Sequence, residues 1–150
     1  MRAEHTLGIF EAGISQPGEM RRLAAIIAPT IGILTNIGPA HGEHFPGGDQ
    51  QKAAEKAALF LSAKLVVHCV DHTLAHMALL DAKVDGQEVI GWSRAGTAYL
   101  RVIRETTDEA RTTLLVEVDG DKHTLHLPFT DGASTGRSSR SSRPCWAERA

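Results

Sequence analysis

The sequence predicts an α/β domain in which a mostly parallel sheet carries flanking helices, with a small antiparallel β ribbon in the second half. In the first half, short apolar runs bounded by glycine and proline alternate with helical patterns, which is typical of parallel strands joined by crossover helices. Beyond Asp85 the β-rich segments follow one another directly, and Asp119-Gly120 is a hairpin signal. A length of 150 residues with 42% apolar composition fits one domain with a core of its own.

The first part of this pattern is strand, helix and strand. Residues 7–12 form a nearly continuous apolar run, so we expect a strand covered on both faces. Helix-start residues lie between Ser15 and Glu19, and Pro29 ends the helical pattern before a second apolar strand over 30–34. Because the connection is short, the two strands should be parallel neighbours whose carboxyl ends lie side by side.

The remaining elements follow from composition and spacing. We predict helices over 49–63, capped by Asp49, and over 72–80, a third buried strand over 65–70, and β segments over 99–105, 112–118 and 122–127. The domain should cover 1–132. Residues 133–150 are rich in Ser and Arg and have little to bury, so we expect a disordered, loosely docked or frame-shifted tail. An arginine-rich nucleic-acid arm is the alternative interpretation of this tail.

Charge and hydropathy exclude several classes of protein. A net charge of −2 gives no overall basic field, so we expect no nucleic-acid partner, and no run of eighteen apolar residues predicts a membrane span. The start of the chain lacks the apolar run and cleavage site of a signal peptide. Cys69 and Cys145, the two cysteines, lie far apart, which indicates a reducing, cytoplasmic location.

Polar residues follow the two expected strands of the first part. Glu11 closes the first strand, where a buried carboxylate needs a metal ion or a basic partner, although an ordinary strand-end carboxylate is the simpler interpretation. Thr35, Asn36 and His41 follow the second strand. His41 and His44 could bind zinc, but two histidines without a cysteine make a weak zinc signal.

Two further groups of residues have simple interpretations. Lys52 and Lys56 share a face of the helix predicted over 49–63, and lone helical lysines are usually surface charges. His68, His72 and His76 recur every four residues, but His68 falls in a predicted strand, so one helix does not carry a three-histidine metal site.

Two motifs, taken together, resemble a known family. Ile-Phe-Glu-Ala-Gly-Ile-Ser-Gln-Pro-Gly-Glu-Met over 9–20 is followed by Pro-Thr-Ile-Gly-Ile-Leu-Thr-Asn-Ile-Gly-Pro-Ala-His over 29–41. The pair resembles the central ATP-binding domain of the Mur ligases, a P-loop-NTPase-like fold, most closely the type that adds D-alanyl-D-alanine to UDP-N-acetylmuramoyl-tripeptide. The resemblance runs from about Thr6 to Asp131, and 13–20 also resembles forms fused to an alanine racemase.

This resemblance implies a metal site and a role for each candidate residue. Glu11 matches a magnesium-binding glutamate, and His41 matches a histidine that helps to hold a second metal. Lys56 matches a lysine that these enzymes carbamylate, which turns a cation into an oxygen ligand suited to Mg²⁺, with Mn²⁺ tolerated. His41 and Lys56 are therefore the expected catalytic residues, while Thr35 and Asn36 are expected on the ATP side.

The implied reaction belongs to peptidoglycan precursor synthesis. ATP phosphorylates the carboxylate of UDP-N-acetylmuramoyl-tripeptide, and the amine of D-alanyl-D-alanine attacks the acyl phosphate. The chain departs from the family because no GxxxxGK[ST] loop occurs in it, and the N- and C-terminal domains of the family are absent. We therefore expect a ligase fragment that does not turn over alone. The alternative is a non-catalytic metal-binding or interaction module on the same scaffold.

Overall fold

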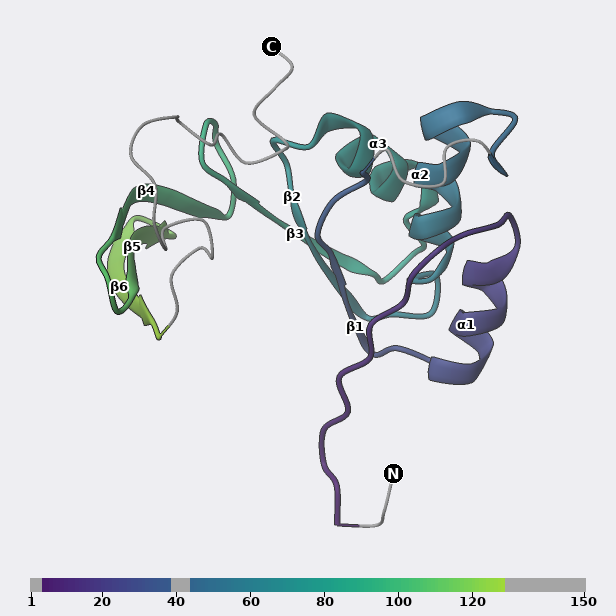
Figure 1. The fold of residues 1–150 in the computed structure, drawn as a ribbon, viewed down its shortest axis with the longest axis horizontal. Coiled ribbons are helices and arrows are strands. Elements are labelled where there is room, and N and C mark those ends of the chain that lie inside the picture. The colour runs from purple at the N-terminus through teal and green to yellow at the C-terminus, as the bar shows by residue number, and fades with distance from the viewer. Residues whose placement is uncertain (1–3, 39–43, 129–150) are drawn as a thin grey trace. The chain divides into compact units, whose positions relative to one another are not determined.

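A computed structural model describes residues 4–38 and 44–128 of the chain (Figure 1). The described strands are hydrogen-bonded in the order β1-β2-β3-β4-β5-β6. The chain divides into two compact units, one formed by Met1–Cys69 with Thr73–Ile90 and the other by Val70–His72 with Gly91–Ala150. The prediction of a mixed α/β sheet, mostly parallel with an antiparallel part in the second half, is confirmed.

The first unit contains three helices and two of the parallel strands. Its elements are α1 (Glu19–Ile27), β1 (Ile31–Leu34), α2 (Gly48–Ala58), β2 (Leu65–Cys69) and α3 (Thr73–Ala82). β1 and β2 are parallel and in register, with Leu34 opposite His68 at their carboxyl ends. The helices and strands predicted in this region are therefore present, except for the strand over 7–12.

The helix α2 differs from its prediction at both ends. It ends at Ala58 rather than at residue 63, because the N–H groups of Leu59 and Phe60 bond to carbonyls three residues back, at 3.3 and 3.0 Å, which tightens the last turn. At the other end the cap residue is Gly47, whose N–H donates to Gln51 Oε1 at 2.8 Å. Asp49 lies in the first turn, so its prediction as the cap is wrong.

Only one face of β1 is covered by the described part of this unit. Leu34 is buried in the core that the three helices share, but Ile31 and Ile33, which point to the opposite face, are 60% and 66% exposed. Side chains alternate between the faces of a strand, so this pattern places the helices on the Leu34 side. The core therefore sits between α1, α2, α3 and that side of β1 and β2.

The predicted strand over 7–12 is not formed. Residues 5–14 belong to no helix or strand, and Leu7 and Ile9 are 74% and 89% exposed. An apolar run becomes a strand only when a neighbouring strand bonds to its backbone and other elements bury its side chains. None of the described strands pairs with this segment, and β1 ends the described sheet. The expectation that Glu11 closes a buried strand is therefore wrong.

The second unit is built on an antiparallel ribbon. β4 (Leu100–Thr107) pairs antiparallel with β5 (Thr112–Val118), which pairs antiparallel with β6 (Asp121–Leu127). The turn between β5 and β6 has φ of 52° at Asp119 and 88° at Gly120, the two positive values that a tight hairpin requires, so the Asp-Gly prediction is confirmed. β3 (Glu88–Ser93) was not predicted, and its Trp92 pairs in parallel with Leu100. No helix within 4–38 or 44–128 has the length and apolar content to cross a membrane.

Candidate metal and nucleotide site

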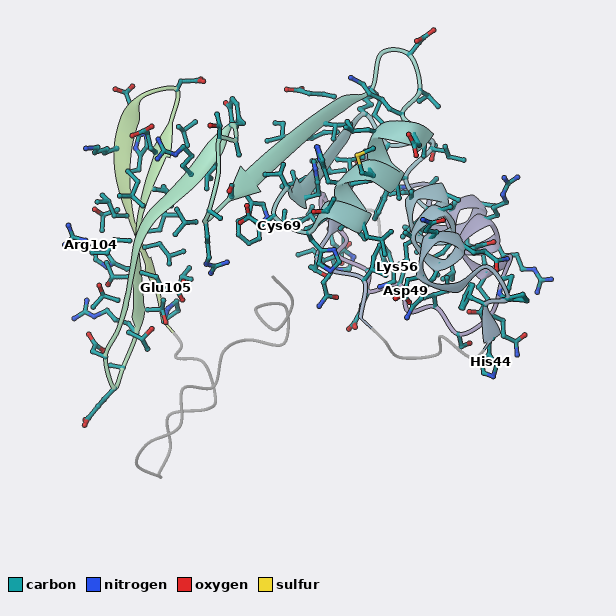
Figure 2. The ribbon with its side chains drawn as sticks, turned by 90° about the horizontal axis from the view of Figure 1, so that it is seen from above. His44, Asp49, Lys56, Cys69, Arg104 and Glu105 are labelled. Atoms are coloured by element: carbon teal, nitrogen blue, oxygen red, sulfur yellow. The ribbon has the colours of Figure 1, made fainter. Side chains whose placement is uncertain are left out.

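Lys56 reaches from α2 to the carboxyl end of β1. Lys56 is labelled in Figure 2. Its ammonium group donates a hydrogen bond to the carbonyl oxygen of Asn36 at 3.0 Å. The side chain is half-buried, and burial followed by the positive charge of Lys52 lowers the pKa of Lys56. A lowered pKa favours the neutral amine, which is the form of lysine that reacts with carbon dioxide. Lys56 is therefore a half-buried lysine with a backbone hydrogen-bond partner.

Lys52, one turn earlier on α2, is a buried lysine. Its side chain is 2% exposed, and its ammonium group donates to the carbonyl oxygen of Gly38. The prediction that Lys52 is a surface charge is therefore wrong. The two lysines are four residues apart, which places them on one face of the helix, and that face meets the loop that follows β1.

The segment before α1 is held by the same helix and by a histidine. Glu55 of α2 accepts a hydrogen bond from the N–H of Gly18 at 2.8 Å. The Nδ1–H of His44 donates to the carbonyl oxygen of Ser15 at 2.9 Å. The two segments that carry the sequence motifs, one before α1 and one after β1, are thus bound by adjacent residues of α2, Glu55 and Lys56.

Glu19 stabilises the turn at the start of α1, as its position in the sequence predicts. Its carboxylate accepts hydrogen bonds from the N–H groups of Ser15 at 2.6 Å and Gln16 at 2.9 Å, and from the Ser15 hydroxyl at 2.9 Å. These hydrogen bonds, from the Ser15 backbone first, lower the pKa of Glu19. The Glu19 carboxylate is therefore already hydrogen-bonded within the local turn and is not a free metal ligand.

The predicted site residues are only partly brought together. Asn36 and Lys56 are joined directly, and Thr35 is exposed beside Asn36. Glu11 is exposed on the segment before α1, and no hydrogen bond or ion pair within the described ranges joins it to Lys56. His41 lies outside the described residues. Likewise, within 4–38 and 44–128 no three His, Cys, Asp or Glu side chains form a group that could hold a metal.

A pair of histidines lies at the carboxyl end of β2. His68 is 2% exposed, and its Nε2 lies 2.7 Å from Nδ1 of His76 on α3, so the two nitrogens share one hydrogen bond. The rings are stacked with centroids 5.0 Å apart. Burial, followed by the charge of His76, lowers the pKa of His68. As predicted, His68 lies in a strand, so no single helix carries all three histidines.

Sequence reasoning missed Lys52 and Glu55 as contacts of the two motifs. The available signal was their spacing, because Lys52, Glu55 and Lys56 fall at i, i+3 and i+4 and so share one face of α2. Spacing alone does not show that these three charged residues contact the protein rather than solvent. They do so because two backbone segments lie against this face of α2.

Comparison with known proteins decides the family. The family model of the Mur ligase middle domain matches residues 1–132. The chain belongs to the Mur ligase family. The match covers most of the chain, so both motifs and all of the described strands and helices fall within the middle domain of Mur ligases.

Relatives and solved structures agree with this family. A UDP-N-acetylmuramoyl-tripeptide–D-alanyl-D-alanine ligase of Treponema pallidum (strain Nichols) is 48% identical over 60 residues, which are 40% of this chain and 13% of that protein. MurF from Acinetobacter baumannii superposes with a TM-score of 0.69 over 88% of this chain and 28% of that one, at 16% identity. The MurF ligase of Thermotoga maritima in complex with ADP gives a TM-score of 0.62 over 79% and 27%, at 19% identity. The chain thus spans less than a third of these Mur ligases.

Proposed function

We propose that this chain supplies the metal-binding half of the ATP site in a ligase that joins D-alanyl-D-alanine to UDP-N-acetylmuramoyl-tripeptide, acting in the cytosol. The observation that carries the proposal is that α2 makes hydrogen bonds to both motif segments. Glu55 holds Gly18 of the first motif, and Lys56 holds Asn36 of the second. The name of the Treponema pallidum relative supports the substrates, and the ADP complex of the Thermotoga maritima neighbour supports the nucleotide.

In this proposal Glu11, His41 and a carbamylated Lys56 hold Mg²⁺ or Mn²⁺, and Thr35 and Asn36 lie on the nucleotide side. The described structure fits this assignment at Lys56, whose side chain ends beside the Asn36 carbonyl, where a carbamate would add oxygen ligands. Glu11 is exposed on the segment before α1, so its assignment rests on the match to the family motif.

The proposed reaction needs this edge of the sheet because negative charge builds there. The terminal phosphoryl group of ATP passes to the peptide carboxylate, the amine of D-alanyl-D-alanine attacks the acyl carbon, and phosphate leaves. Bound Mg²⁺ would neutralise charge on the phosphoryl oxygens. Two residues of α2 would keep the two motif segments in place around these ligands. Lys56 bonds to Asn36 after β1, and Glu55 bonds to Gly18 before α1. The phosphate-binding loop would come from other parts of a longer ligase.

Carbamylation of Lys56 is tested directly by carbon-13 NMR. In ¹³C-bicarbonate at mildly alkaline pH, the 150-residue chain is expected to show a carbamate resonance, because Lys56 is half-buried and its pKa is lowered. Lys56→Gln should remove the resonance, while Lys83→Gln, at an exposed lysine, should leave it unchanged. A resonance that survives in Lys56→Gln, or is missing from the unaltered chain, would refute this part of the proposal.

A further inference from the structure

The two faces of the antiparallel ribbon formed by β4, β5 and β6 differ in chemistry. Residues directly opposite each other in an antiparallel pair share a face, so the strand register assigns each side chain to a face. One face is largely apolar and contains the buried Val116. The other, which we call the polar face, contains Arg101, Arg104, Leu115, Glu117, Lys122 and Thr124. Its three cations are exposed, so the polar face presents positive charge to solvent.

Positive charge is in excess on the polar face. Arg101 bonds to Glu117 at 3.1 Å, and Lys122 lies directly opposite Glu117 on the other neighbouring strand, so two cations share one carboxylate. Arg104 lies opposite Leu115 instead of a carboxylate, and its side chain makes no ion pair or hydrogen bond with residues 4–38 or 44–128. Like charges on one face of a sheet destabilise it, so this excess is a cost that a bound anion would relieve.

An apolar side chain lies at the centre of the polar face. Leu115 is half-buried and lies between Arg104 on β4 and Thr124 on β6, with Lys122 diagonal to it. An apolar centre with a polar rim is typical of surfaces that bind proteins. A phosphate-bearing ligand would meet the cations but would bring no aliphatic side chain to cover Leu115. The described residues of this face also include no Phe, Tyr or Trp on which nucleic-acid bases could stack. The arrangement therefore favours a protein partner.

We propose that the polar face binds an acidic segment of a partner protein, which places an apolar side chain over Leu115 and carboxylates at Arg104 and Lys122. The site lies within the second unit and does not rest on the proposed ligase function. Symmetric pairing of two polar faces is disfavoured, because the excess cations of two copies would meet each other. The partner is therefore a different protein that carries carboxylates on both sides of an apolar residue.

The test is an NMR titration of the ¹⁵N-labelled 150-residue chain with the end-blocked peptide Glu-Glu-Leu-Glu-Glu-Leu-Glu-Glu. Saturable shifts are expected at amides of β4, β5 and β6 around Leu115, and added NaCl should weaken binding because it screens exposed charges. The same peptide with Gln in place of Glu should bind roughly tenfold more weakly or worse, since it lacks the charge. A peptide with Ser in place of Leu should also bind more weakly, because it cannot cover Leu115.

Substitutions at Arg104 test the predicted contact from the side of the chain. Arg104→Glu should weaken binding of the acidic peptide roughly tenfold or more, and it should gain binding of a peptide with Lys in place of Glu. Arg104→Gln, which removes the charge without reversing it, should show a smaller loss. Arg21→Glu is the matched control at an exposed arginine of α1, and it should bind the acidic peptide as the unaltered chain does.

Several results would overturn the proposal, and each leaves the proposed ligase function untouched. They are an absence of saturable shifts on the ribbon, equal binding of the Glu and Gln peptides, and unchanged affinity in Arg104→Glu. If Arg104→Glu does not fold, unchanged affinity in both Arg104→Gln and Lys122→Gln has the same meaning. Tripolyphosphate or a DNA duplex that displaces the acidic peptide and binds more tightly would identify a phosphate-bearing ligand instead.

Discussion

Gly32→Ala is expected to lower the free energy of unfolding by about 1–3 kcal/mol, the usual effect of overpacking a core. A Cβ atom at position 32 would lie 2.3 Å from Cδ1 and 2.7 Å from Cε1 of Phe60. The Phe60 ring is 6% exposed and packed in the core, so it cannot swing aside without displacing its neighbours. Urea unfolding followed by circular dichroism measures the change.

A matched control and a double variant identify the cause of this loss. Gly13→Ala, at a glycine where an added Cβ atom would meet nothing within 4 Å, should leave stability nearly unchanged. Phe60→Leu should recover part of the loss when combined with Gly32→Ala, because it shortens the side chain that the new methyl group meets. Equal losses for Gly32→Ala in the presence and absence of the Phe60 ring would contradict contact with Phe60 as the cause.

Stability should also fall as the pH drops below about 6.5, the value at which an unperturbed histidine titrates. Burial, followed by the charge of His76, lowers the pKa of His68 in the folded chain, so the unfolded chain takes up a proton first. The His68 contribution is therefore complete above the unfolded value and is lost as the pH falls through the folded value. The slope for one proton reaches about 1.4 kcal/mol per pH unit.

The measurement is urea unfolding at several pH values between about 7.5 and 5. His68→Phe, which removes the buried titrating group, should flatten the dependence. His123→Gln, at an exposed histidine of β6, should keep the slope of the unaltered chain. An unchanged slope in His68→Phe would show that the His68–His76 pair is not its origin.

The sequence predicts the elements that carry their own local signals. Apolar runs with helical spacing between them predict β1, α1, β2 and α3, and the Asp119-Gly120 turn predicts the hairpin of β5 and β6. These elements depend on neighbours that lie close along the chain. Their pattern is therefore visible in short windows of sequence.

The predictions that are wrong concern residues whose burial depends on partners far away in the sequence. The run over 7–12 has the composition of a strand, but no described strand bonds to it, so its side chains remain exposed. Lys52 has the composition of a surface residue, but the Gly38 carbonyl, fourteen residues away, receives its ammonium group in the core. Neither outcome is encoded in local composition, because both are set by which segments meet in the fold.

We propose that Glu11, His41 and Lys56 form one metal site. Mn²⁺ titration in bicarbonate, followed by electron paramagnetic resonance, tests it most directly in the unaltered chain and in Glu11→Ala, His41→Ala and Lys56→Gln. Each of these three changes is expected to weaken binding roughly tenfold or more, while Glu4→Ala, at an exposed carboxylate, should not. Binding of Mn²⁺ by Glu11→Ala and His41→Ala as tight as that of the unaltered chain would contradict the claim.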